Sequence, residues 1–191
     1  MDKKEACVAL GLDEGKRYML FFGLVRAYKG LDLLLDAFGK VKDELKDLQL
    51  IVAGEFYEDE DKYRRQISDN GLIDRVIIKN EFIADADLRK YFGAADLIVQ
   101  PYKTATQSGV TQVAFHFEKP CLVTNVGGLG EIIHDGKMGY AVVPQADAIA
   151  KALVDYYENE RQEAFTKYLI KEKELYGWDK MTGVILSLEF R

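Results

Sequence analysis

Residues 17–41 read RYMLFFGLVRAYKGLDLLLDAFGKV, and this stretch decides the fold class. After Arg17 an unbroken apolar run reaches Gly23, as in a strand that is buried on both faces. From Lys29 to Leu45, apolar residues recur at helical spacing with charged residues between them, which predicts a helix that packs on the strand. The stretch is therefore a strand, a loop and a covering helix.

The same alternation continues along the chain. More strands are predicted at residues 48–53, 76–78, 96–99, 121–124 and 140–143. Between them the pattern predicts helices at 59–70, 85–92 and 108–117 and a short helical turn at 130–134. Strands and helices that alternate in this way favour right-handed crossovers, so we expect an α/β fold with a doubly wound, Rossmann-like parallel sheet. From about residue 146 the pattern is purely helical, at 146–158 and 161–176.

Composition limits the class of protein. The chain has 191 residues, of which 48% are apolar and 30% charged, so we expect one globular domain over residues 1–191 with a helical C-terminal tail. The net charge of −6 argues against nucleic acid as a partner, because phosphate backbones bind basic surfaces. Two distant cysteines, Cys7 and Cys121, indicate a reducing compartment. The charged N-terminus argues against a secretory signal, so we expect a cytoplasmic location.

The loop after the first strand, residues 23–30, contains two cations, Arg26 and Lys29, between glycines. Ligands of doubly wound sheets bind beyond the carboxyl ends of the strands, where this loop is expected. An arginine and a lysine at that point are suited to neutralise a diphosphate. The alternative is that both are solvated loop charges, which is the more common role of such a pair elsewhere.

The loop after the fourth strand runs into a helix that opens with Ser108, Gly109 and Val110. The first turn of a helix has unpaired N–H groups and the positive end of the dipole, and Gly109 allows close approach, so this start is a predicted phosphate site. Alternatively, Ser108 or Thr106 is only an N-cap.

The loop after the fifth strand contains the pair Gly127 and Gly128, followed by Glu131. Paired glycines allow a tight backbone turn near a ligand, and the carboxylate of Glu131 accepts hydrogen bonds from hydroxyl groups. An equally good interpretation makes the glycines a turn between a strand and a helix and Glu131 a carboxylate at the start of that helix.

Taken together, the three loops resemble the C-terminal domain of the retaining glycosyltransferases of group 1, family four, which have the GT-B fold. The resemblance covers nearly the whole chain. The segment from Tyr176 to Asp179 is similar to the family's C-terminal segment, which crosses back to the N-terminal domain. The other matching stretches are FFGLVRAYKGLDLLLDAF (21–38), LIVAGEF (50–56), AADLIVQPY (94–102), QSGV (107–110) and KPCLVTNVGGLGEII (119–133).

This resemblance implies transfer of a sugar from a nucleotide-diphosphate sugar to an acceptor, with retention at the anomeric carbon and without a bound metal. Arg26 and Lys29 would be the catalytic residues that stabilise the departing diphosphate. Such electrostatic stabilisation is commonly among the largest contributions to catalysis. The segment from Asn80 to Ile83 would lie against the base. The expected donor contacts are Gly23, Phe82, Gln107, Ser108, Gly109, Val110, Gly128 and Glu131.

The chain departs from the family at two positions. The family has two glutamates, eight residues apart, that contact the transferred sugar and the ribose. The corresponding positions here are Ala105 and Val113, with Gln107 and Gln112 as nearby polar residues. This departure leaves both contacts open.

The resemblance also implies a partner, the N-terminal acceptor domain, which we expect to be absent from this chain. Acceptor groups and the family's catalytic histidine would belong to that half, so the isolated domain is expected to be inactive. Any contact with a membrane would be made through the missing N-terminal half. His116 and His134 are expected to be structural or solvated, with no ligand partner at metal spacing. Two alternatives remain, a non-catalytic nucleotide-sugar-binding module and an epimerase or phosphorylase of the same fold.

Overall fold

The computed structural model describes residues 1–175, so the segment Tyr176–Asp179 lies outside the described residues. Its centre is a six-stranded sheet in the order β3-β2-β1-β4-β5-β6, in which every neighbouring pair is parallel. This confirms the predicted fold class. The strands are β1 (Arg17–Phe22), β2 (Leu48–Ala53), β3 (Val76–Lys79), β4 (Leu97–Gln100), β5 (Cys121–Thr124) and β6 (Gly139–Val142).

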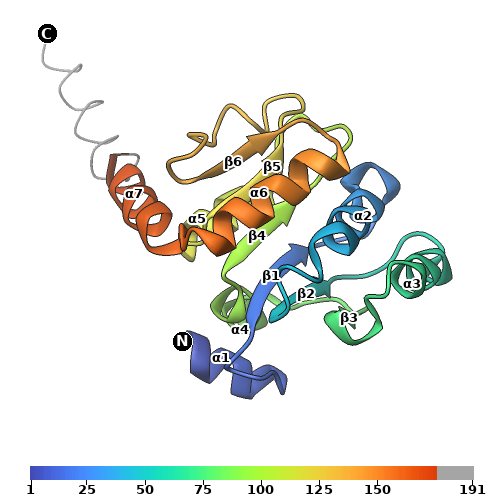
Figure 1. Cartoon of the computed structure of the whole chain (residues 1–191). Coiled ribbons are helices and arrows are strands. Elements are labelled where there is room, and N and C mark those ends of the chain that lie inside the picture. Colours follow the sequence, from blue (N-terminus) through green and yellow to red (C-terminus); the bar gives the residue numbers. More distant parts are fainter. Residues whose placement is uncertain (176–191) are drawn as a thin grey trace, which may run out of the picture.

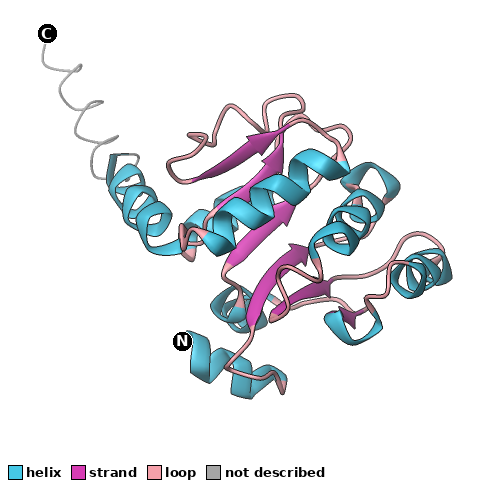
Figure 2. Cartoon of the chain, viewed as in Figure 1, coloured by secondary structure: helices cyan, strands magenta, loops and turns pink. Residues whose placement is uncertain are grey.

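Helices cover both faces of the sheet (Figure 2). One face carries α2 (Leu31–Val41), α3 (Glu60–Asp69) and α6 (Ala146–Glu158). The other face carries α1 (Lys3–Leu10), α4 (Leu88–Ala94) and α5 (Gly109–His116). The chain continues from α6 into α7 (Gln162–Leu175), which lies beyond one end of the sheet in Figure 1. Within residues 1–175 no helix combines the length and the apolar character needed to cross a membrane.

The alternation of side chains in β1 explains why two layers of helices are needed. Met19 and Phe21 pack with α2 and α6 in one hydrophobic cluster. Tyr18 and Leu20 point to the opposite face and pack with α1 and α4 in a second cluster. Because successive strand residues face opposite sides, an unbroken apolar strand is stable only when both faces are covered.

Two of the predicted helical segments differ from the structure. The helix predicted from Lys29 to Leu45 is interrupted at Gly30, whose φ of 70° is left-handed, so Lys29 ends a 3₁₀ turn, η1 (Ala27–Lys29), and α2 begins only at Leu31. The predicted helical turn at 130–134 is a series of turns, with Ile133 N–H donating to Gly130 at 3.3 Å, and forms no helix. The first difference arises at the left-handed Gly30, because apolar spacing carries no signal for backbone handedness.

The helix α1 is not predicted by the apolar pattern. It is defined by its ends: Asp2 and Glu5 form a reciprocal capping box at the start, and Gly11 ends the helix in the left-handed conformation. Only Ala6 and Cys7 are buried, so the apolar face is too narrow to give a periodic signal. The acid three residues after Asp2 is the sequence signal that identifies this helix.

The end of α5 places a glutamate where glycine is favoured. Glu118 has a φ of 58°, its N–H donates to Phe115, and Lys119 N–H donates to Ala114, which together form a Schellman arrangement. We expect Glu118→Gly to raise the free energy of unfolding by about 0.5–1 kcal/mol, because glycine adopts this conformation without strain. Urea unfolding measures the change. Glu118→Ala is the control, since it also removes the ion pair with Lys173 but keeps the strained φ; equal stability of the two variants would contradict the explanation.

Candidate functional site

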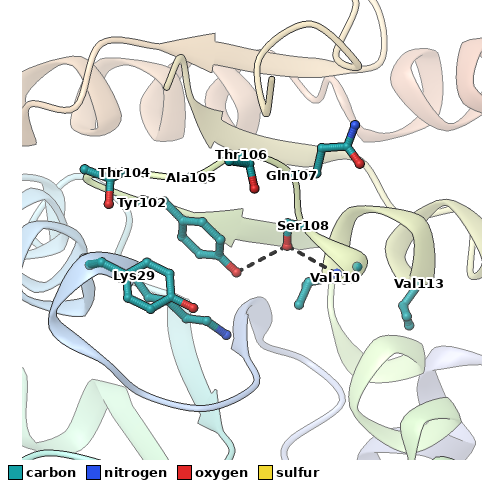
Figure 3. A pocket seen from close by; sticks show the side chains of 11 residues that line it. Lys29, Tyr102, Thr104, Ala105, Thr106, Gln107, Ser108, Val110 and Val113 are labelled. Carbon is teal, nitrogen blue, oxygen red and sulfur yellow. Dashed lines mark hydrogen bonds between the residues drawn. The ribbon is translucent and has the colours of Figure 1, made fainter. Parts of the chain in front are cut away.

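The order of the strands reverses between β1 and β4, and a cavity of about 800 Å³ opens at their carboxyl ends. Ligands of doubly wound sheets bind at such a reversal, because the loops on either side leave in opposite directions and part there. Figure 3 shows the side chains that line the cavity. They come from the loop after β1 and from the loop and helix after β4: Tyr28, Lys29, Tyr102, Thr104, Ala105, Thr106, Gln107, Ser108, Gly109, Val110 and Val113.

Lys29 is the cation of this cavity. Its side chain is buried, with 8% of the residue exposed, and its ammonium lies 5.6 Å from the centre of the Tyr102 ring. Burial lowers the pKa of Lys29, and the positive charge of Arg26 lowers it further. Within the described part of the chain no carboxylate pairs with it. A buried cation without a counter-ion is costly, and an anion in the cavity would remove that cost.

Gly23 makes room for this ammonium. A Cβ atom at Gly23 would lie 3.0 Å from Lys29 Nζ and 3.9 Å from Val110 Cγ2. The lysine ammonium and the start of α5 therefore border the same point at the end of β1. The structure thus places Lys29 and the open helix start at one edge of the sheet, and Figure 3 shows the ammonium end of Lys29 directed toward Val110. Their roles in binding a ligand stay predictions.

The start of α5 is capped and open to the cavity. Ser108 is the N-cap, and its Oγ accepts the N–H of Val110 at 3.2 Å. A Cβ atom at Gly109 would have no neighbour within 4 Å, so the first turn is accessible to a ligand. The N-cap interpretation and the phosphate-site interpretation are thus compatible, because the N–H groups of Val110 and Thr111 both bond to Ser108, whereas the N–H of Gly109 has no hydrogen-bond partner within residues 1–175 and is left for a ligand.

Close backbone contacts hold the three loops together. A Cβ at Gly30 would lie 2.0 Å from the carbonyl oxygen of Pro101, and a Cβ at Gly127 would lie 1.8 Å from that of Ala105. Lys103 N–H donates to the carbonyl of Tyr28 at 2.7 Å. The glycines therefore act by allowing neighbouring loops to touch, which positions the cavity walls.

Arg26 does not line the cavity with Lys29. It is exposed, and its guanidinium carbon lies 4.9 Å from the centre of the Tyr57 ring. The cation–π contact directs the side chain toward the loop after β2. The two cations of the first loop are thus close enough to repel each other but face different neighbours.

Four predicted donor contacts lie outside the cavity lining: Gly23, whose neighbours are given above, and three more. Phe82 follows β3 and is 75% exposed. Gly128 packs behind the second loop, where its N–H donates to the carbonyl of Thr106 at 3.0 Å. Glu131 borders a second cavity, of about 680 Å³, between α5, the β5–β6 connection and α7. A Cβ at Gly128 would lie 3.9 Å from both Glu131 Oε2 and Gln107 Cγ, so these residues form the wall between the two cavities.

Sequence reasoning missed the tyrosines of the cavity. Tyr28 and Tyr102 both line it, and their ring centres are 6.0 Å apart. Burial raises the pKa of Tyr102 to about 12. Their positions in the sequence could have identified them, since Tyr28 lies between the two cations and Tyr102 follows closely after the end of β4. Ala105 and Val113 also line the cavity, and no acidic side chain is among its lining residues.

The described part of the chain offers no cluster for a metal. Among residues 1–175, no group of three or more histidine, cysteine, aspartate or glutamate side chains is arranged to hold a metal ion. His134 instead contacts the hydroxyl of Tyr168 through Nδ1 at 3.0 Å. The expectation that no metal takes part stays a prediction.

Comparison with known proteins gives a family. The family described as glycosyl transferases group 1 matches residues 2–172. The lipopolysaccharide core biosynthesis mannosyltransferase LpsB of Rhizobium meliloti is 30% identical over 158 residues, which are 81% of this chain and 44% of LpsB. A D-inositol 3-phosphate glycosyltransferase of Paenarthrobacter aurescens is 28% identical over 175 residues, which are 89% of this chain and 43% of the relative. The chain thus spans about half the length of these relatives.

Solved structures have the same fold. The C-terminal domain of LpcC, a glycosyl transferase group 1 family protein of Francisella tularensis, superimposes with a TM-score of 0.81 at 20% identity over 92% of both chains. HepE of Anabaena, solved in complex with UDP, superimposes with a TM-score of 0.80 at 20% identity, over 100% of this chain and 53% of its own. At this level of identity the likeness concerns the fold alone.

Proposed function

This chain belongs to the glycosyl transferases group 1 family, and from that premise we propose that its cavity binds the diphosphate of a nucleotide-sugar donor in retaining glycosyl transfer. The observation that carries the proposal is the ammonium of the buried Lys29, which has no acidic partner among residues 1–175 and faces the open start of α5. A cation and a helix N-terminus around one point form an anion site. A nucleotide diphosphate provides the anion that this family's reaction releases.

The proposed chemistry is electrostatic. When the sugar leaves, the bond between its anomeric carbon and the terminal phosphate oxygen breaks, and the electron pair stays on the diphosphate. Lys29, the hydroxyl of Ser108 and the N–H of Gly109 at the start of α5 stabilise that charge as it develops. The acceptor oxygen forms the new bond to the anomeric carbon, and the proton of the acceptor hydroxyl passes to the departing diphosphate. Arg26 adds positive charge from the same loop at longer range, so we assign it a smaller share.

The rest of the donor is assigned to the surrounding loops. We propose that Gly23, Gln107, Gly109 and Val110 contact the phosphates and sugar, that Gly128 and Glu131 support that wall, and that the segment 80–83 with Phe82 contacts the base. Because LpsB and the D-inositol 3-phosphate glycosyltransferase are each about twice as long as this chain, we propose that the acceptor half and the complete activity belong to a longer, cytoplasmic protein. A UDP-sugar is the donor we favour, since HepE was solved with UDP.

A panel of nucleotides tests this proposal by calorimetry. We expect the chain to bind UDP, GDP or ADP saturably, to bind the matching monophosphate about tenfold more weakly, and to bind the nucleoside more weakly again. The reason is that each phosphate that the ligand lacks means the loss of a charge-assisted contact. Added salt should weaken the binding of the diphosphate. The proposal fails if no diphosphate gives a saturable response, or if UDP and uridine bind equally.

A binding module without turnover is the second candidate function. It is favoured by the lack of any carboxylate among the cavity-lining residues, where Ala105 and Val113 are apolar. Product analysis with the full-length parent protein and a nucleotide sugar separates the two functions. Transfer to an acceptor supports the enzyme, whereas binding without consumption of the donor supports the module.

A further inference from the structure

Two hydroxyl groups in the cavity, those of Tyr102 and Ser108, form a pair beside the start of α5. We infer that Tyr102 is a positioning residue that directs the hydroxyl hydrogen of Ser108 at an anion bound in the cavity. The inference rests on the proposed function, because it assumes that the anion is the diphosphate. It assigns a role to a buried tyrosine whose ring also faces Lys29.

The geometry limits where the hydrogen of Ser108 can point. Ser108 Oγ lies 3.2 Å from the N atom of Val110 and 3.3 Å from the hydroxyl oxygen of Tyr102 (Figure 3). A hydroxyl group has one hydrogen and accepts two hydrogen bonds. When Val110 N–H and the Tyr102 hydroxyl both donate to Ser108 Oγ, both acceptor positions are filled, and the hydrogen of Ser108 is left for the cavity.

An anion selects this arrangement from the two that the pair allows. Without a ligand, either hydroxyl can donate to the other. An anion beside the helix start attracts the hydrogen of Ser108, and Tyr102 then becomes the donor to Ser108. Hydrogen bonds connected in this way polarise one another, so the Tyr102 hydroxyl strengthens a contact that it does not itself make.

The surroundings of Tyr102 fit a fixed donor. The residue is 3% exposed, its ring packs edge-on against Tyr28, and the hydroxyl of Thr124 donates to its carbonyl oxygen. Burial raises the pKa of Tyr102 to about 12, so the hydroxyl keeps its proton at neutral pH. The centre of the ring lies 5.6 Å from Lys29 Nζ and the hydroxyl 3.3 Å from Ser108 Oγ, so the tyrosine adjoins both groups that meet the anion.

A double-mutant cycle measured with UDP tests the inference. We expect Tyr102→Phe, which keeps the ring, to weaken UDP binding about fivefold, the effect of one hydrogen bond. In a Ser108→Ala background the same change should alter the dissociation constant less than twofold, because no hydroxyl is left to orient. In a Ser108→Thr background, which keeps a hydroxyl, the fivefold effect should return. A purely structural role for Tyr102 would give the same effect in every background.

Tyr157→Phe is the matched control, since Tyr157 of α6 is also buried, lies outside the lining of this cavity, and has a hydroxyl without a hydrogen-bond partner among residues 1–175. It should leave UDP binding unchanged in each background, and circular dichroism verifies that each variant is folded. Equal effects of Tyr102→Phe with and without the Ser108 hydroxyl would overturn the inference. The proposed function would still stand in that case, as long as the unmodified chain binds UDP. Failure of the unmodified chain to bind UDP overturns both.

Discussion

Replacing Lys29 by methionine should weaken the binding of a nucleoside diphosphate by roughly 50-fold or more, because a charge that pairs with the ligand in a buried site is lost. The same change should raise the free energy of unfolding of the unliganded protein by about 1 kcal/mol, since an apolar side chain of similar length replaces an unpaired buried cation. Calorimetry with UDP measures the first effect and urea unfolding the second. Weaker binding together with a higher free energy of unfolding would identify a residue that stabilises the bound ligand but destabilises the unliganded protein.

The pH dependence gives this prediction a second test. Burial and the charge of Arg26 hold the pKa of Lys29 below its usual value, so the amine loses its proton at lower pH in the folded protein than in the unfolded chain. The affinity for a diphosphate should fall as pH rises through that lowered pKa. The stability cost of the charge is fully present below the folded pKa and is relieved as pH rises from that value toward the unfolded pKa. Both trends should be missing in Lys29→Met.

Lys103→Met is the matched control for the charge. Lys103 lies on the loop after β4, is exposed, and pairs with Asp32 at 2.6 Å. An exposed ion pair contributes little to stability, and this ammonium is engaged away from the cavity. We expect the control to change UDP affinity less than about threefold. Equal losses in Lys29→Met and Lys103→Met would mean that only the general charge of this surface matters, and would contradict a specific site.

The parts of this site that follow from buried strands were predictable. The apolar run after Arg17 and the helical spacing that follows predict a parallel sheet, and a parallel sheet places loop residues of β1 and β4 at one edge. Lys29 and the helix start at Ser108–Val110 were therefore expected to meet, and they border the same cavity. The prediction needed only the order of elements.

Side-chain directions were not predictable in the same way. Arg26 was expected beside Lys29, but its guanidinium packs on Tyr57, a residue of the loop after β2. Tyr102 was not selected, although it lines the cavity, because its role depends on the positions of Lys29 and Ser108 in space. Periodicity indicates which backbone segments meet at the sheet edge, whereas long polar side chains choose among several neighbours there.

The glycine after Lys29 leads to the second large effect, on stability. Gly30 has a φ of 70°, and a Cβ there would lie 2.0 Å from the carbonyl oxygen of Pro101. In Gly30→Ala the left-handed conformation costs about 1 kcal/mol and the displaced backbone about 1–3 kcal/mol more. We expect a loss of about 3 kcal/mol in the free energy of unfolding, measured in urea.

Gly136→Ala separates the two causes of that loss. Gly136 has a φ of 69°, but a Cβ there would meet nothing within 4 Å, so the variant measures the conformational cost alone, about 1 kcal/mol. A further consequence applies to Gly30→Ala only. Moving the β1 loop away from Pro101 also moves Lys29, the preceding residue, away from the start of α5, so UDP affinity should fall together with stability. Equal stability losses in the two alanine variants, with unchanged UDP affinity, would mean that the contact between the β1 and β4 loops does not position the cation.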